Sequence, residues 1–178
     1  MGFRPNRSTR DNIFIVRQIF EKSYEHNIDL YNIYVDYTYA FDSVYRNEII
    51  KCLTKSEVPD KLIRLIVVLT LTHTSARVKV NRDFREEFII ECGVKQGDPL
   101  SATLFSLVTD TLLKQMELRG NTTTRLTQCT AYSEDILLII RTKQSLLDTF
   151  QKPKETSAQY GLIVNGQKTK YVRCRRKN

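Results

Sequence analysis

The sequence predicts an α+β fold, in which a small antiparallel sheet is backed by helices on one face. Strand-like runs rich in β-branched and aromatic residues alternate with stretches whose apolar residues recur at helical spacing. Two strand-like runs, RLTQCTAY and ILLII, are separated only by Ser133, Glu134 and Asp135, which predicts a hairpin. A chain of 178 residues with 41% hydrophobic content can bury a sizeable core, so one domain is expected.

The first third of the chain is expected to hold helices around one strand. Ser8 or Thr9 is suited to cap an amphipathic helix that carries an apolar face. A β-rich run extends through Val35 and breaks at Asp36, and a helix is expected over about 47–53. The apolar face of the first helix consists of Ile13, Val16, Ile19 and Phe20.

Three further elements follow in sequence order. A second helix is expected to follow Pro59 and to run through Leu69, because proline fits the first helical turn. SARVKV and EEFIIECGV resemble strands joined by NRDFR, which predicts a hairpin. GDPLSATLFSLVTDTLLKQM then predicts a turn into a long, mostly apolar helix.

Composition narrows the classes of partner and compartment. The net charge of +8 and the pI near 9.4 favour a polyanionic partner, more often nucleic acid than a membrane surface. Four widely spaced cysteines without companion histidines indicate neither a zinc site nor a disulfide scaffold. The apolar run 62–71 is too short to cross a bilayer. An intracellular protein is expected, with nucleus or cytoplasm unresolved.

Three acidic residues stand where strands end. Asp36 follows a strand-like run, and Glu134 and Asp135 occupy the predicted hairpin turn. If the two strand systems are neighbours in one sheet, three carboxylates converge, which is unfavourable unless divalent cations neutralise them. That arrangement suits a two-metal site for phosphoryl transfer. In the alternative interpretation, Asp36 caps a helix and the acidic pair belongs to a solvated turn.

Four segments resemble the palm motifs of reverse transcriptases in their order and spacing: YVDYTYAFDSV, GVKQGDPLS, AYSEDILLI and GLIVNGQKTKY. The chain is most similar to non-LTR (LINE-like) retrotransposon polymerases, and GFRPNRST resembles their fingers segment. The resemblance implies a polymerase palm with partial fingers and no thumb. Residues 1–178 would then be a partial reverse transcriptase domain, with about 1–30 as a fingers remnant and about 31–178 as palm.

The resemblance also assigns roles to residues. Asp36, Glu134 and Asp135 are implied as catalytic metal ligands for Mg²⁺, with Mn²⁺ as the alternative. The implied partners are an RNA template, a DNA primer and deoxynucleoside triphosphates, with no membrane and with protein partners unknown. The implied substrate-binding residues are Phe41 as the steric gate against ribonucleotides, Gln96 and Gly97 along the nucleotide and template, and Lys168 near the leaving pyrophosphate. The implied nucleic-acid-binding residues are Arg4, Arg7 and Arg10, which would contact template phosphates.

Each of these assignments has a simpler alternative. Phe41 would be an ordinary core residue, Gln96 and Gly97 part of a turn that opens a helix, and Lys168 one cation of a basic tail. The arginines would be solvated surface residues.

The acidic pair departs from the family pattern. The family hairpin reads Tyr-x-Asp-Asp, whereas this chain has Tyr132, Ser133, Glu134 and Asp135. The additional methylene of Glu134 displaces a ligand for which Mg²⁺ demands near-ideal geometry, and a misplacement of about 1 Å can cost on the order of 10²-fold in rate. An impaired polymerase is therefore expected. A catalytically inactive nucleic-acid-binding remnant is the alternative, and an unrelated basic structural domain is a third.

Overall fold

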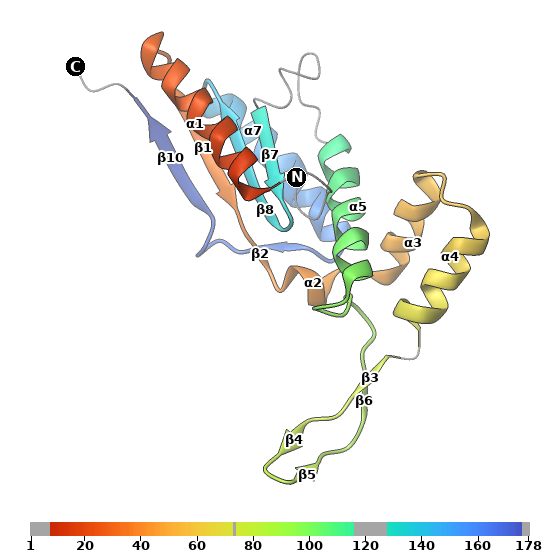
Figure 1. Ribbon diagram of the computed structural model, residues 1–178. Coiled ribbons are helices and arrows are strands. Elements are labelled where there is room, and N and C mark those ends of the chain that lie inside the picture. The colour runs from red at the N-terminus through yellow and green to blue at the C-terminus, as the bar shows by residue number, and fades with distance from the viewer. Residues whose placement is uncertain (1–7, 73, 116–127, 176–178) are drawn as a thin grey trace.

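A computed structural model describes residues 8–72, 74–115 and 128–175. Its centre is a four-stranded antiparallel sheet with strand order β10-β1-β8-β7 (Figure 1). The predicted mixture of helices with an antiparallel sheet is confirmed. Among the described residues, no helix combines the length and the apolar content needed to cross a bilayer. The strands are β1 (Leu30–Val35), β7 (Cys129–Tyr132), β8 (Asp135–Ile140) and β10 (Lys170–Cys174).

The register of the sheet brings the acidic segments to one end. Strand β1 pairs with β8 so that Val35 lies opposite Ile136, which places Asp36 next to the start of β8. Tyr132 pairs with Asp135, which leaves a two-residue turn, and Ser133 adopts a left-handed φ of 56° in it. Such turns demand left-handed backbone because of the twist of the flanking strands. The predicted hairpin is confirmed, although Asp135 belongs to the strand and not to the turn.

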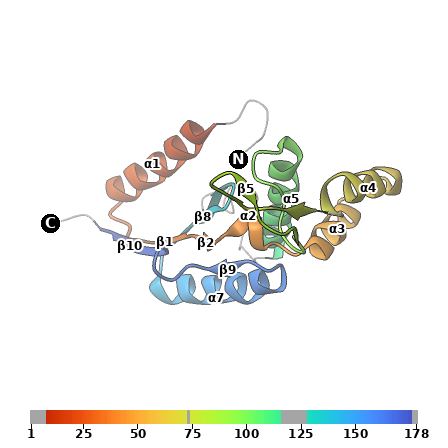
Figure 2. The same cartoon turned by 90° about the horizontal axis from the view of Figure 1, so that it is seen from below.

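Helices cover both faces of the sheet, so the prediction of helices on one face was wrong. Helix α1 (Thr9–Glu25) lies over one face and α7 (Lys143–Gln159) over the other (Figure 2). The reason is the run ILLII in β8, whose successive side chains point to opposite faces. Leu137 and Ile139 pack toward α1, whereas Ile136 and Leu138 belong to the main core. Both faces are therefore apolar and both need a cover.

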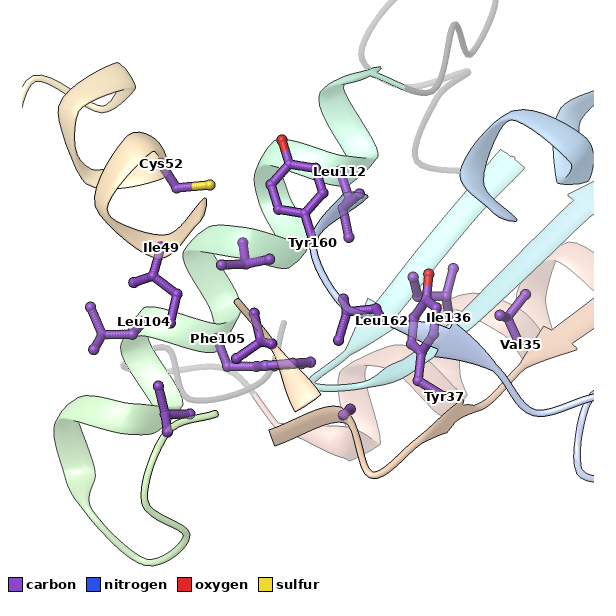
Figure 3. Close-up of a cluster of buried hydrophobic side chains, with 14 of the residues drawn as sticks. Val35, Tyr37, Ile49, Cys52, Leu104, Phe105, Leu112, Ile136, Tyr160 and Leu162 are labelled. Atoms are coloured by element: carbon purple, nitrogen blue, oxygen red, sulfur yellow. The ribbon is translucent and has the colours of Figure 1, made fainter. Parts of the chain in front are cut away.

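The main core lies between the sheet, α7 and two further helices (Figure 3). Helix α5 (Pro99–Gln115), the long helix that the sequence predicts, contributes Phe105, which is fully buried. Helix α3 (Arg46–Lys55) confirms the helix expected over 47–53 and contributes Ile49. Full burial of a large aliphatic or aromatic side chain contributes roughly 1.5–3 kcal/mol. The core thus joins elements that are far apart in the sequence.

Short elements connect these layers. Ser8 is the N-cap of α1, and its backbone N–H donates to Asp11 Oδ2 at 2.7 Å. A short strand pair, β2 (Tyr37–Thr38) with β9 (Ile163–Val164), continues the chain beyond the main sheet. The other helices are α2 (Ala40–Ser43), α4 (Asp60–Ile66), which begins after Pro59 as predicted, and the π-helical turn η1 (Val67–Leu71).

A two-stranded ribbon extends away from the body between η1 and α5 (Figure 1). Its strands are β3 (Ser75–Ala76), β4 (Lys79–Val80), β5 (Asp83–Phe84) and β6 (Phe88–Ile89); β3 pairs with β6 and β4 with β5. The predicted hairpin is confirmed. Its turn is shorter than NRDFR, because Val80 pairs with Asp83 and only Asn81 and Arg82 remain between them.

The predicted basic tail is partly an ordered strand. Lys170 and Arg173 lie in β10, which pairs with the outer side of β1. Arg173 donates to Asp29 Oδ2 at 2.5 Å, and its guanidinium lies 5.4 Å from the centre of the Tyr31 ring. These contacts hold a strongly basic strand at the sheet edge, where charged residues also discourage pairing with other chains.

Candidate active site

A cleft of about 710 Å³ opens at the end of the sheet where Asp36 and the β7–β8 turn meet. Its walls come from the segment after β1, from α2, from the loop before α5, from the first turn of α5 and from the loop after β9. The cleft brings together six of the residues that the sequence singled out: Asp36, Phe41, Gln96, Gly97, Glu134 and Lys168.

Asp36 is fixed through its backbone while one carboxylate oxygen is left without a partner. Its N–H donates to Thr169 Oγ1 at 3.3 Å, and its carbonyl accepts from the Asn165 N–H at 2.8 Å. Its Oδ1 is buried and has no hydrogen-bond partner among the described residues. The alternative interpretation as a helix cap is not what the structure shows, because Tyr39 is the N-cap of α2. A buried carboxylate oxygen without a donor suits a cation.

Glu134 and Asp135 face different surroundings. Glu134, in the turn, lines the cleft together with Asp36. Asp135, the first residue of β8, shares the face of Leu137 and borders a groove between α1 and the sheet. Asp135 lies on that face because side chains alternate along β8, whereas Glu134 precedes the strand, in the turn.

The three carboxylates are nevertheless electrostatically coupled. Partial burial, and then the negative charges of Glu134 and Asp36, raise the pKa of the Asp135 carboxyl. Among the described residues, no group of three or more His, Cys, Asp or Glu side chains is arranged as a metal site. Two carboxylates in one cleft, one with an unpartnered oxygen, are the hard oxygen donors that Mg²⁺ or Mn²⁺ prefers, so these residues fit a divalent cation.

Phe41 belongs to both the cleft and the core. Its ring stacks on Phe105 with the ring centres 4.4 Å apart, while it also lines the cleft. Its carbonyl accepts from the Val94 N–H at 2.8 Å. Phe41 is therefore a core residue, as in the alternative interpretation, and also part of the wall of the cleft. The Phe105 ring supports it from behind.

Gln96 is oriented by a residue whose role sequence reasoning missed. Its Nε2 donates to Asp42 Oδ2 at 2.9 Å, and both residues line the cleft. The sequence alone suggests only a cap or a surface role for Asp42. The two residues are 54 positions apart, so no local signal could have paired them.

The start of α5 faces the cleft. Asp98 Oδ1 accepts from the Leu100 N–H at 2.8 Å, and Pro99 is the first helical residue, so the helix is well capped. Ser101, Ala102 and Thr103 line the cleft from its first turn. A helix N-terminus carries a partial positive charge and favours anions such as phosphates. An aspartate followed by proline and an apolar run is a sequence signal that could have found this cap.

Two glycines allow loops to pack against α2. Gly93 has a φ of 78°, and a Cβ there would lie 2.5 Å from the Asp42 carbonyl oxygen. Gly161 has a φ of 81°, and a Cβ there would collide with the Ser43 carbonyl oxygen. Both positions therefore require the absence of a side chain. The helical turn that carries Phe41 is thus held from two sides.

Lys168 is brought to the cleft by a turn that also contacts Asp36. Asn165 Oδ1 accepts from the N–H groups of Gln167 and Lys168, at 3.1 and 3.2 Å, and the Thr169 N–H donates to the Asn165 carbonyl. Arg10 lies in the exposed first turn of α1, outside the cleft. Arg4 and Arg7 lie outside the described residues.

Curated relatives are retrotransposon proteins. The chain is 30% identical over 171 residues to the Retrovirus-related Pol polyprotein from type-2 retrotransposable element R2DM of Drosophila melanogaster, covering 94% of this chain and 16% of that protein. It is 28% identical over 164 residues to the Retrovirus-related Pol polyprotein from type-1 retrotransposable element R2 of Bradysia coprophila, covering 90% of this chain and 18% of that protein. The chain therefore spans less than a fifth of either relative.

Solved structures share the fold. Telomerase from Candida Tropicalis in complex with the TWJ fragment of telomeric RNA superposes with a TM-score of 0.75 at 18% identity, over 94% of this chain and 30% of that one. The apo telomerase gives a TM-score of 0.71 at 19% identity, over 97% of this chain and 34% of that one. The sequence profile of the family described as reverse transcriptase (RNA-dependent DNA polymerase) matches residues 1–177. The resemblance to non-LTR retrotransposon polymerases is confirmed, and the chain belongs to the reverse transcriptase family.

Proposed function

We propose that this chain forms the palm, with part of the fingers in about residues 1–30, of a non-LTR retrotransposon reverse transcriptase that extends a DNA primer on an RNA template. The observation that carries the proposal is the cleft in which Asp36, Glu134 and Lys168 meet the N-terminal end of α5. Carboxylates for a cation beside cationic groups for phosphates are what nucleotidyl transfer requires.

Asp36 and Glu134 would hold the divalent cation, with Asp135 as the adjacent third carboxylate. A bound cation of this kind lowers the pKa of an attacking hydroxyl and neutralises charge on the transferred phosphoryl group. The unpartnered Oδ1 of Asp36 supports this assignment. Mg²⁺ is the proposed ion, and Mn²⁺ is the ion that would tolerate the longer Glu134 side chain better, because Mg²⁺ demands stricter geometry.

The rest of the cleft would bind the deoxynucleoside triphosphate. The start of α5 and Lys168 would bind the β- and γ-phosphates, since both present positive charge to the cleft. Phe41, supported from behind by Phe105, would lie under the sugar and exclude a 2′-hydroxyl. Gln96, held by Asp42, would contact the incoming nucleotide and the template. The primer 3′-hydroxyl then attacks the α-phosphate, and pyrophosphate leaves.

The alternative function is a nucleic-acid-binding remnant without chemistry. Glu134 favours it, because the family pattern has aspartate there and the added methylene moves the carboxylate within the cleft. The net charge of +8 would support RNA binding in either case.

The test is primer extension on an RNA template, with Mg²⁺ or Mn²⁺. Because the chain spans 16% of the Drosophila relative, it replaces the matching region of that polyprotein in a chimera. Glu134→Asp should extend the primer on the order of 10²-fold faster than the unaltered chimera in Mg²⁺. Asp135→Glu is the matched control, because it adds the same methylene to the neighbouring carboxylate, which does not line the cleft. It should change the rate less.

The outcomes separate the two functions. Extension by either chimera that Asp36→Asn abolishes supports the polymerase. RNA binding without extension by the unaltered chimera and by Glu134→Asp would instead support the remnant. Equal, measurable extension rates for the unaltered chimera and Glu134→Asp would show that glutamate is an acceptable ligand and that the expected impairment is wrong.

A further inference from the structure

The two-stranded ribbon, residues 75–89, exposes more apolar surface than its own structure accounts for. Four residue pairs join its strands, and an isolated two-stranded hairpin is marginally stable in water. Phe84 is 65% exposed and Ile89 is 77% exposed. Val78, Val80 and Phe88 are exposed as well. Apolar residues gathered on a projecting element are typical of a contact surface.

The outer half of the ribbon is also cationic. Residues 77–85 contain four basic residues and one acidic residue, Asp83, and Glu86 and Glu87 follow them toward the base. Arg77 is paired with Glu87 at 2.8 Å, near the base. Among the described residues, no ion pair engages Lys79, Arg82 or Arg85, and the Lys79 ammonium lies 5.6 Å from the centre of the exposed Phe84 ring. The tip therefore presents three cations and an exposed aromatic ring, with Lys79 beside that ring.

One side chain joins the two ends of the ribbon at its base. The guanidinium of Arg46, at the start of α3, donates to the carbonyls of Leu71 at 2.9 Å, Ile90 at 2.8 Å, Gly93 at 3.0 Å and Cys92 at 3.4 Å. These carbonyls precede and follow the ribbon, so Arg46 joins both of its ends. The planar fork of arginine suits this role, which the single ammonium of a lysine could not perform.

The ribbon continues directly into the wall of the cleft. After Gly93, the Val94 N–H donates to Phe41, and Gln96 donates to Asp42. The base of the ribbon is therefore held next to the cleft, as an element that guides a long ligand would need to be.

We propose that the ribbon is a docking arm for single-stranded nucleic acid. Lys79, Arg82 and Arg85 contact backbone phosphates, and a base stacks on Phe84. Cations interleaved with an exposed aromatic ring are typical of single-strand recognition. The cations bind the phosphates, and the ring stacks on the face of a base. A protein partner is favoured less, since three exposed cations at one tip, without an ion-pair partner in the described part of the chain, favour a polyanion. The arm requires no chemistry in the cleft, so the inference goes beyond the proposed function.

The experiment measures binding of the purified chain to a fluorescent single-stranded RNA by anisotropy, between 50 and 200 mM salt. The tip variant combines Lys79→Gln, Arg82→Gln and Arg85→Gln. Loss of three phosphate contacts should reduce the slope of log affinity against log salt by about 2, since each contact contributes about 0.7 for single strands. A matched control combines Arg141→Gln, Lys143→Gln and Lys154→Gln, three exposed cations next to or on α7. This control should change the slope much less.

Phe84→Ala tests the stacking contact separately. It should weaken RNA binding by about fivefold or more with an unchanged salt slope, because stacking carries no charge. Circular dichroism should be unaltered in both variants, as the substituted side chains are exposed.

The proposal is overturned if the tip and control variants lose the same slope, if the unaltered chain does not bind RNA, or if Phe84→Ala binds normally. A tip-dependent loss of binding in a chain whose chimera does not extend a primer would support the arm while the proposed polymerase function fails.

Discussion

The central sheet and the ribbon are both antiparallel β-structure, yet they are held in place by different means. In the sheet, β8 is buried on both faces, between α1 and the main core, and Leu138 is fully inaccessible. In the ribbon both strands are exposed, and Arg46 fixes its base. Strand pairing alone therefore does not hold a β-element in one position. Burial stabilises the sheet, whereas the ribbon depends on polar contacts and is available to a partner.

The largest effect should come from the carboxylate at the end of β1. Asp36→Asn should lower primer extension in the chimera by on the order of 10³-fold, equivalent to about 4 kcal/mol of lost charge stabilisation. RNA binding by the ribbon should be unchanged, so chemistry and binding separate between the two regions. Comparable losses of extension rate and of RNA affinity would show that chemistry and RNA binding do not separate between the two regions.

A core substitution should affect stability far more than a ribbon substitution. Leu138→Ala should cost about 2–5 kcal/mol of unfolding free energy, because it leaves a cavity in a packed core. Phe84→Ala should change stability by less than about 0.5 kcal/mol, because exposed side chains contribute little. Urea unfolding followed by circular dichroism measures both. A cost at Phe84 that approaches the cost at Leu138 would mean that the ribbon is buried in solution.

Arg46→Lys should loosen the ribbon and leave the sheet intact. The lysine cannot satisfy the four carbonyls, of which those of Gly93 and Leu71 are partly buried, and an intramolecular hydrogen bond contributes about 0.5–1.5 kcal/mol. Amide hydrogen exchange should accelerate at Ile90 and Gly93, and the amides of β1 should keep their protection. Arg77→Lys, at the exposed ion pair with Glu87, is the matched control and should have little effect. Faster exchange throughout the chain would assign Arg46 a general structural role.

The smallest effect concerns the coupling between the three carboxylates. The pKa of Asp135 is raised in the folded chain above its ordinary value of 3.8 by burial and by the charges of Glu134 and Asp36. The folded state thus binds that proton more tightly than the unfolded state, and stability falls as the pH rises through the raised pKa. Asp135→Asn should therefore raise the melting temperature at neutral pH without metal.

The gain from Asp135→Asn should be below about 1 kcal/mol, since the side chain is largely solvent-exposed. It should vanish below pH 3.8, where the wild-type carboxyl is protonated in both states. Mg²⁺ should reduce the difference at neutral pH, because a cation relieves the repulsion between carboxylates. Thermal melts across pH, with and without Mg²⁺, measure both effects. An equal gain from Asp148→Asn, at an exposed position of α7, would point to net charge in place of local repulsion.

Some of the fold was readable from the sequence because it depends on local pattern. Apolar runs and turn residues predicted β1, both hairpins and α5, and the family motifs led to Asp36, Glu134, Gln96, Gly97 and Lys168, which line one cleft. The sequence did not predict α7 or β10. The seventeen residues of α7 are mostly polar and include a proline, and the basic sequence of β10 resembles a tail. A polar strand such as β10 forms because its backbone pairs with that of β1. That pairing joins segments far apart in the sequence, so no local pattern predicts it.

The sequence by itself determined which residues could hold a cation and bind a nucleotide, because the chemistry of a carboxylate, a lysine or a glycine is fixed by its side chain. Only the tertiary structure decided where they point. It turned Glu134 into the cleft and Asp135 toward α1, joined Gln96 to Asp42 across 54 positions, and joined Arg46 to Gly93 across 47. Such contacts depend on sheet register and on burial across distant segments, which no local pattern encodes.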